Sequence, residues 1–253
     1  MFAWSWRKHN SNRCNTRNCF CWFPEFVILG ICCECHIIKK IFKLLNIFFI
    51  MSQEQVWDAI AESWNNFRQK PKQFAVEYSQ NWSKGKILDI GSGNCRNLFP
   101  FAEKEFDCYG IDFSDEALKK AKQFCNKNKI KVNLKKADAT SLPFKNKSFD
   151  YVLAIAIIHV IEKKENRTKV LSEIKRILKN NGRALITFWN KNPINLIFSK
   201  DEYVKWGKQL RFYHFYSINE IKKECKTAGL KIEKIKIIKY KKSKFKDILV
   251  EIS

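Results

Sequence analysis

Acidic residues are scarce in this sequence of 253 residues: 25 Asp and Glu stand against 48 Lys and Arg, which gives a formal net charge of +23. This excess favours an anionic partner, such as a nucleic acid, an acidic lipid or an acidic substrate, and indicates nothing about the fold. Nucleotide bias in the gene is a second explanation for the abundance of Lys. Because 45% of the residues are hydrophobic, a disordered tail or low-complexity fibre is excluded, and the length fits one large α/β domain or two small ones.

Long hydrophobic runs and complete sets of metal ligands are also missing. The apolar stretch 26–33 ends at Glu34, well short of the roughly 18 uncharged residues that a membrane-spanning helix needs. Cys32 and Cys35 form a C-x-x-C pair, but no second pair at zinc-finger spacing completes a ligand set. We therefore expect no stable membrane insertion and no metal site, while an interfacial helix over 37–50 remains open.

Residues 1–50 differ in composition from the rest. They contain six of the ten cysteines and no Asp or Gln, and an ordinary globular pattern begins directly after Met51. We therefore expect residues 1–50 to be an atypical extension outside the fold, produced by a misassigned start, and residues 51–253 to form the folded domain. The other cysteines are widely spaced, as is typical of buried thiols in a reducing compartment, here expected to be the cytoplasm.

Residues 52–253 alternate between helical and strand patterns. A first helix is indicated by apolar residues at three- and four-residue steps, which lie on one helix face: Val56, Ile60, Trp64 and Phe67. A second helix begins at its cap residue Ser114, and a third ends before Gly182. The expected strands are the apolar segments 86–90, 106–111, 130–134, 151–158 and 184–189.

The C-terminal part follows a different pattern. Ser217 and Glu220 match an S-x-x-E capping box for a helix that Gly229 closes. Two alternating strands, 232–240 and 245–252, follow and predict a closing hairpin. Because strand and helix alternate five times before this helix and hairpin, the sequence predicts an α/β fold. Its sheet is doubly wound and mostly parallel, with an antiparallel last strand.

A glycine-rich turn follows the first expected strand. Gly91 and Gly93 lie where this strand turns into a helix, so the backbone can approach a ligand closely and present its N–H groups to it. Asp112 follows Gly93 by 19 residues, at the end of the next strand, where a carboxylate can accept both hydroxyls of a ribose. Together these features predict a cofactor that contains adenosine.

The same turn argues against a dinucleotide. A dinucleotide site has a third glycine three residues after the second, and Arg96 stands there. Asp89, directly before the glycines, is poorly suited to a pyrophosphate. Its carboxylate suits a ligand that carries a cationic sulfonium and an ammonium group.

Four segments in this order resemble the signatures of class I S-adenosylmethionine-dependent methyltransferases: 89–93, 110–112, 137–144 and 148–150. The resemblance implies a Rossmann-like methyltransferase sheet with S-adenosylmethionine as cofactor. Cys95 stands where that family usually has a glycine or another small residue, which implies an altered cofactor affinity. The resemblance implies Gly91 and Gly93 at the methionine half, Asp112 at the ribose, and Asp138 with Ala139 at the adenine. Asp89 joins them as a cofactor residue because its carboxylate suits the cationic groups.

Three further segments, 155–159, 186–190 and 211–216, resemble the tRNA wobble-uridine carboxymethyl methyltransferases, a group that includes the methyltransferase domain of an AlkB homologue. This resemblance implies RNA binding and methylation of the carboxylate of 5-carboxymethyluridine, or a related modified uridine, in tRNA. It also implies a small zinc-binding activator protein as a partner. The sequence departs from the group at Val160, where a second histidine is usual, and at 180–182, where Pro-Gly-Gly is usual.

A carboxylate acceptor is already ionised at neutral pH, so the enzyme's task reduces to placing it in line with the methyl group. Four residues expected beyond the strand ends are candidates to hold the carboxylate and the uracil: Arg211, His214, Tyr213 and His159. Core packing and ordinary surface charge are the alternative interpretations of the same residues. Methylation of a small molecule and a non-catalytic protein that retains the fold remain open as functions.

Overall fold

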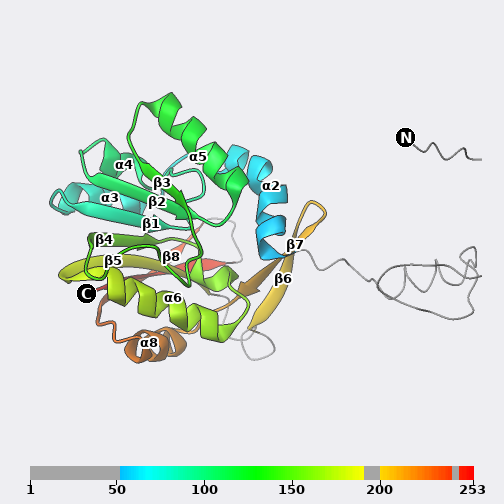
Figure 1. Ribbon diagram of the computed structural model, residues 1–253. Coiled ribbons are helices and arrows are strands. Elements are labelled where there is room, and N and C mark those ends of the chain that lie inside the picture. Colours follow the sequence, from blue (N-terminus) through cyan, green and yellow to red (C-terminus); the bar gives the residue numbers. More distant parts are fainter. Residues whose placement is uncertain (1–51, 191–199, 241–244) are drawn as a thin grey trace, which may run out of the picture. The chain divides into compact units, whose positions relative to one another are not determined.

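A computed structural model describes residues 52–190, 200–240 and 245–253 (Figure 1). The expectations for the extension 1–50, for an interfacial helix and for the Cys32–Cys35 pair lie outside these residues. Within them, no helix is both long and apolar enough to cross a membrane.

The centre of the fold is a seven-stranded sheet in the order β3-β2-β1-β4-β5-β9-β8. Strands β3 to β5 pair in parallel, whereas β9 pairs antiparallel with both β5 and β8. The predicted doubly wound α/β sheet with an antiparallel last strand is therefore confirmed. The strands are β1 (Lys86–Ile90), β2 (Asp107–Asp112), β3 (Asn133–Lys136), β4 (Phe149–Ala154), β5 (Leu178–Asn190), β8 (Ile232–Lys239) and β9 (Lys246–Ile252).

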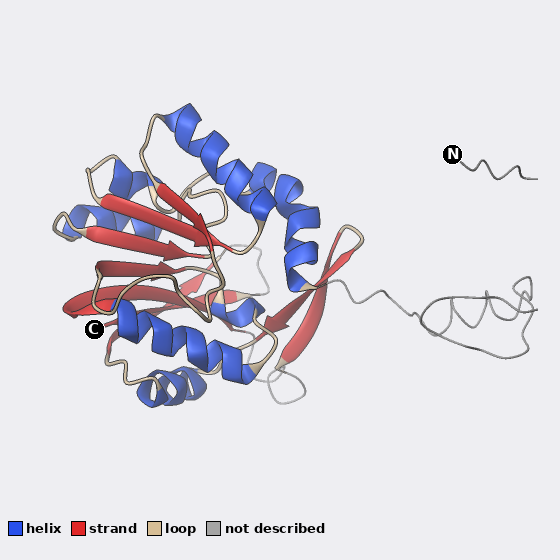
Figure 2. Ribbon diagram, viewed as in Figure 1, coloured by secondary structure: helices blue, strands red, loops and turns tan. Residues whose placement is uncertain are grey.

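Helices cover both faces of this sheet (Figure 2). One core joins the sheet to α6 and α8 through residues such as Val170 and Ile221, and a second joins it to α3, α4 and α5 through residues such as Phe74 and Ala121. The helices are α2 (Gln53–Phe67), α3 (Gln73–Asn81), α4 (Phe99–Ala102), α5 (Asp115–Asn128), α6 (Lys164–Ile177) and α8 (Ile218–Thr227).

Several element boundaries differ from the expected ones. The strand expected over 151–158 ends at Ala154, because Ala156 has a left-handed φ of 60° and Ile158–Val160 form a 3-10 turn. The third strand begins at Asn133 rather than at residue 130. Only half of the expected capping box forms: the Ser217 hydroxyl accepts from the Glu220 N–H, while the Glu220 carboxylate contacts other side chains.

A two-stranded hairpin outside the main sheet was not expected from the sequence. It consists of β6 (Asp201–Trp206) and β7 (Gln209–His214), which pair antiparallel. Strand β7 packs against α2 (Figure 1). The hairpin and the C-terminal half of α2 thus lie together near the carboxyl ends of the parallel strands, the edge at which doubly wound sheets bind ligands.

Candidate cofactor and acceptor site

The glycine turn after β1 has the backbone conformation that its residue types favour. Gly91 and Gly93 have φ values of +67° and +53°, which L side chains rarely adopt. A Cβ at Gly91 would lie 2.8 Å from Ile157 Cδ1, whereas the space beside Gly93 is open. The turn is therefore shaped to leave room next to Gly93 for a ligand.

Asp112 closes the turn from the end of β2. Its Oδ2 accepts the Gly93 N–H at 2.9 Å and its Oδ1 accepts the Ser114 N–H at 3.0 Å. Burial raises the pKa of this carboxyl to about 6. Each oxygen keeps a second lone pair, so the carboxylate can still accept hydrogen bonds from a pair of ribose hydroxyls.

Asp89 is buried beneath the same turn without a hydrogen-bond partner. Neither of its carboxylate oxygens, nor the nearby Ser92 hydroxyl, is paired within the described part of the chain. Burial raises the pKa of Asp89 to about 8. An ionised buried carboxyl without a partner is costly unless a cation compensates it, so a positively charged group nearby would favour the ionised form of Asp89.

A pocket of about 350 Å³ lies at the carboxyl ends of the parallel strands. Gly91, Gly93 and Asp112 line it on one side, and Asp138 and Ala139 line it beyond β3. These five predicted cofactor residues are thus brought together, whereas Asp89 lies underneath the pocket rather than at its surface. The Asp138 carboxylate accepts the Thr140 N–H at 2.7 Å.

Cys95, the departure from the methyltransferase signature, points away from this pocket. Its φ of 65° is left-handed, the conformation for which glycine is usual at this position. The side chain is fully buried in the core that includes Cys125. The cysteine is therefore accommodated by the core beneath the turn and does not narrow the pocket.

Helix α2 forms a wall of the pocket that the sequence did not reveal. Trp57, Trp64 and Asn65 line the cavity, although the helical periodicity indicated only a packing face. Side chains of the cofactor turn hold the end of this helix: Asn94 Nδ2 donates to Asn65 Oδ1 and to the Arg68 carbonyl, both at 2.9 Å. The cofactor turn and the helix end are thus linked directly.

Arg211 lies behind this wall in a cage of aromatic rings. Its guanidinium carbon is 5.2 Å from the Trp64 ring centroid, 4.9 Å from that of Trp206 and 5.0 Å from that of Tyr213. The side chain is only 4% exposed, yet its Nε and one terminal nitrogen have no hydrogen-bond partner among the described residues. A buried, unpaired guanidinium beside a pocket wall fits a site for an anionic group.

Tyr213 and His159 stack beside Arg211. The Tyr213 ring is parallel to Trp189 at 4.5 Å, and His159 stacks on the same Trp189 at 4.9 Å. The Tyr213 hydroxyl is buried and has no partner in the described chain. Burial lowers the pKa of His159 to about 3, so this imidazole is neutral at physiological pH and packs behind the tyrosine.

His214 is separated from the other three candidates. Side chains alternate along a strand, so Arg211 and Tyr213 share one face of β7 and His214 lies on the other. There its Nδ1 is 2.5 Å from Asp201 Oδ1 and its Nε2 is 3.0 Å from Glu220 Oε1. Both ring nitrogens are thus engaged by carboxylates that tie the hairpin to α8, which the sequence pattern could not show.

Arg68 is a basic residue that sequence reasoning missed. It follows α2 directly, and its guanidinium carbon lies 5.0 Å from the ring centroids of both Trp64 and Phe67. Its Nε is buried without a partner among the described residues. Burial lowers the pKa of Arg211, and the positive charge of Arg68 lowers it further; both guanidinium groups lie beside the Trp64 ring.

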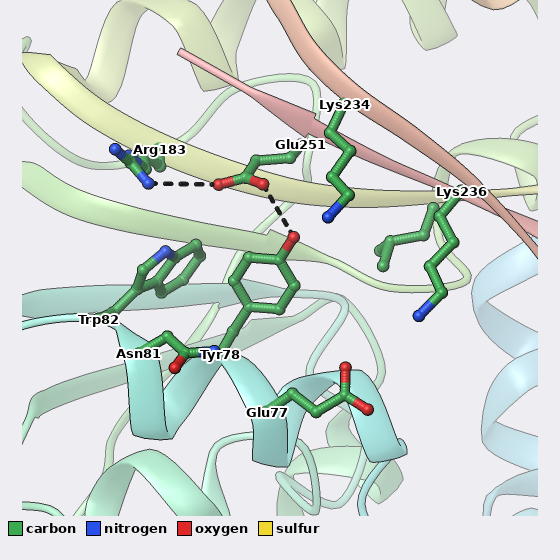
Figure 3. Close-up of a pocket in the computed structure, with 9 residues that line it drawn as sticks. Glu77, Tyr78, Asn81, Trp82, Arg183, Lys234, Lys236 and Glu251 are labelled. Atoms are coloured by element: carbon green, nitrogen blue, oxygen red, sulfur yellow. Dashed lines mark hydrogen bonds and ion pairs between the residues drawn. The ribbon is translucent and has the colours of Figure 1, made fainter.

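A second cavity of about 300 Å³ lies between α3 and the β8–β9 strands (Figure 3). Glu251 contacts both the Tyr78 hydroxyl at 2.8 Å and Arg183 at 3.5 Å there. No part of the glycine turn lines it. This cavity is therefore separate from the cofactor pocket.

The site fits S-adenosylmethionine. The unpaired Asp89 carboxyl suits the cationic methionine end of this cofactor. The open space beside Gly93 lets the cofactor come close to the protein backbone. The free lone pairs of the Asp112 carboxylate suit the ribose hydroxyls. When bound, this cofactor supplies an electrophilic methyl group on a sulfonium. Asp138 and Ala139, the residues expected at the adenine, line the same pocket.

Comparisons with known proteins agree with this geometry. A family described as "Methyltransferase domain" matches residues 88–186. The tRNA (carboxymethyluridine(34)-5-O)-methyltransferase of Saccharomyces cerevisiae is 29% identical over 136 residues, which are 53% of this chain and 47% of the relative. The enzyme of that name from Macaca fascicularis is 32% identical, over 53% of this chain and 19% of its own length. The matched region thus spans about half of the yeast relative and a fifth of the macaque one.

Other relatives have different names. A ubiquinone/menaquinone biosynthesis C-methyltransferase of Geotalea uraniireducens is 29% identical, over 58% of each chain. Among solved structures, a Methanosarcina mazei S-adenosylmethionine-dependent methyltransferase has a TM-score of 0.64 at 17% identity, over 72% of this chain and 97% of that one. A Haloferax volcanii methyltransferase, solved in complex with a methyltransferase activator, has a TM-score of 0.61 at 17% identity, over 79% of this chain and 96% of that one.

The matched family, the sheet order and the cofactor pocket all point to one class of enzyme. The chain contains a class I S-adenosylmethionine-dependent methyltransferase domain.

Proposed function

We propose that this protein methylates the carboxylate of 5-carboxymethyluridine, or a related modified uridine, at the wobble position of tRNA. The observation that carries the proposal is the buried Arg211 guanidinium, whose Nε and one terminal nitrogen have no hydrogen-bond partner among the described residues. It lies behind the pocket wall formed by Trp57 and Trp64. An anionic acceptor would compensate this charge. The relatives named for carboxymethyluridine methylation support the same choice.

The proposed reaction needs positioning rather than acid–base chemistry. The bound cofactor would supply the methyl group to one oxygen of the ionised acceptor, and loss of the carbon–sulfur bond would leave a methyl ester and neutral S-adenosylhomocysteine. No proton has to move. Arg211 and the Tyr213 hydroxyl, which lie behind the pocket wall, would attract the carboxylate and orient one of its oxygens toward the methyl group.

The other two candidates have supporting roles in this proposal. His159 is neutral and positions Tyr213 through the shared stack on Trp189. His214 holds the hairpin in place through Asp201 and Glu220. Asp89 compensates the positive charge of the cofactor, and the pocket residues from Gly91 to Ala139 hold its remaining parts.

We also propose a small zinc-binding activator protein as a partner and the cytoplasm as the location. The activator proposal is supported by the solved Haloferax volcanii complex. The second candidate function is methylation of a small molecule, which the quinone-biosynthesis relative favours. Assays on bulk tRNA and on a small-molecule extract distinguish the two.

Substitution of Arg211 tests the acceptor site. Arg211→Ala should lower kcat/KM for tRNA that carries 5-carboxymethyluridine by about a hundredfold, because it removes a buried charged partner of the carboxylate. Binding of S-adenosylhomocysteine, measured by calorimetry, should not change. Arg183→Ala, which removes an arginine at the second cavity, should behave like the parent. Normal methylation by Arg211→Ala would contradict the proposal, as would transfer to the small-molecule extract alone.

A further inference from the structure

Phe67 is a large aromatic side chain that stays exposed at the end of α2. The helical spacing groups it with Val56 and Ile60, which are buried, yet its own side chain is 66% exposed. Isolated exposed hydrophobic residues are common on protein surfaces. This one differs because it ends a continuous row of rings that begins in the pocket.

The row consists of four rings in successive contact. The ring centroids of Trp57 and Trp64 are 5.6 Å apart, those of Trp64 and Trp206 are 5.1 Å apart, and those of Trp206 and Phe67 are 5.8 Å apart. Trp57 and Trp64 line the pocket. Trp206 is fixed by a hydrogen bond from its Nε1 to Ser63 Oγ at 2.8 Å. An aromatic wall therefore runs from the acceptor side of the pocket to the surface at Phe67.

Positive charge follows this wall. The Arg68 guanidinium contacts the rings of Phe67 and Trp64, and its Nε has no partner among the described residues. The backbone of Arg68 is held by Asn94. Close by, Arg96 donates to the Lys70 carbonyl at 2.7 Å. Burial lowers the pKa of Lys72 against the opposing effect of Asp247, and the positive charges of Arg96 and Arg68 lower it further. The outer end of the wall thus combines an exposed ring with the Arg68 guanidinium.

An exposed ring beside a guanidinium matches single-stranded nucleic acid, in which each nucleotide offers a flat base and a negative phosphate. We propose that Phe67 and Arg68 form a second RNA subsite. The base next to the acceptor nucleoside stacks on the open face of Phe67, and Arg68 binds the intervening phosphate. This subsite rests on the proposed function, because a small-molecule acceptor has no neighbouring base.

The test compares substrates with and without a neighbouring base, using the full chain. Methylation kinetics are measured on free 5-carboxymethyluridine nucleoside and on an anticodon stem-loop RNA that carries it, and fluorescence anisotropy reports binding of the same labelled stem-loop. Phe67→Leu should raise both KM and Kd for the stem-loop about tenfold, because a stacked base is lost. Its kcat/KM for the free nucleoside should remain that of the parent, and Phe67→Tyr should restore stem-loop binding.

Tyr203→Leu is the matched control. Tyr203 is 59% exposed and pairs with Phe212, so it lies on the face of the hairpin opposite Arg211; its loss should leave stem-loop binding unchanged. The subsite is refuted if Phe67→Leu binds the stem-loop like the parent, or if Phe67→Tyr binds as weakly as Phe67→Leu. If stem-loop binding depends on Phe67 but no methyl is transferred, the proposed function fails while the subsite stands. A parent protein that does not bind the stem-loop overturns both.

Discussion

Asp89 has opposite effects on stability and on cofactor binding. Its carboxyl is buried without a partner among the described residues, and burial raises its pKa from 3.8 to about 8. The folded, cofactor-free protein therefore keeps a proton that the unfolded chain releases above pH 4. For this reason the contribution of Asp89 to the free energy of unfolding decreases as pH rises from about 4 to 8.

Asp89→Asn should therefore stabilise the cofactor-free protein, with a rise in Tm that is larger at pH 8 than at pH 5. It should also weaken binding of S-adenosylhomocysteine at least about tenfold, because an amide cannot compensate the ligand's ammonium group. Differential scanning fluorimetry and calorimetry measure the two effects. Asp107→Asn, at an exposed carboxyl of β2, is the control. A lower Tm at pH 8 or an unchanged affinity would contradict this account.

The positions of residues that are set by local conformation could be predicted from the sequence. Gly91 and Gly93 have positive φ values, and Asp112 follows at the end of the next strand, so motif and spacing were sufficient to place them. The environment of Arg211 could not be predicted in this way. Its cage is built by α2 and the hairpin, which are separated by more than a hundred residues in the sequence, and only the folded chain brings Trp64 and Trp206 to it.

At the scale of elements, the accuracy of the predictions followed the clarity of each pattern. Strand β1 matches its expected bounds because an apolar segment ends there at a glycine turn. Strand β4 was predicted too long because apolar residues continue into the turn at Ile158–Val160. The β6–β7 hairpin was missed because the exposed and half-buried residues of β6 alternate without a strong apolar pattern.

Helix α2 and the cofactor turn form a coupled pair of elements. Asn94 joins them through two hydrogen bonds, and Asn97 Oδ1 accepts the Lys72 N–H at 3.1 Å. Binding of S-adenosylhomocysteine to the turn should therefore also slow amide hydrogen exchange at 65–72. In Asn94→Ala we expect this remote protection to disappear at 65–68, where Asn94 makes its contacts, while protection persists at Lys72, which Asn97 still holds, and at 91–97.

Removal of the two Asn94 hydrogen bonds should also cost about 1–3 kcal/mol of stability. Asn128→Ala, which removes a bond to the Phe124 carbonyl within a single helix, serves as the control and should retain protection at 65–72. Persistence of protection at 65–68 in Asn94→Ala would show that the turn and the helix respond independently.

For the whole molecule, most of the net positive charge belongs to residues 51–253 and not to residues 1–50. Residues 51–253 carry 41 basic and 23 acidic residues, hence +18, and residues 191–253 alone carry 16 and 7, hence +9. The second of these segments contains the hairpin that holds Arg211. Half of the excess of residues 51–253 therefore lies in the part of the chain proposed to meet the acceptor.

Methylation of tRNA should consequently weaken with salt. If several lysines and arginines contact phosphates, kcat/KM for tRNA should fall more than about tenfold between low and moderate ionic strength, because counterions compete for the same charges. Methylation of the free nucleoside, measured over the same range, should change little. A tRNA rate that is independent of salt would contradict an RNA substrate.

The position of β9 determines when the sheet can be completed during synthesis. This strand separates β5 from β8 and pairs with both, yet it is translated after every other strand of the sheet. Until residues 246–252 leave the ribosome, the edge of β5 has no partner and its apolar side chains, including Phe188, lack part of their cover. Strands β1 to β5 can pair with one another earlier. Until β9 inserts, however, the nascent domain exposes an unpaired strand edge that can pair with other chains.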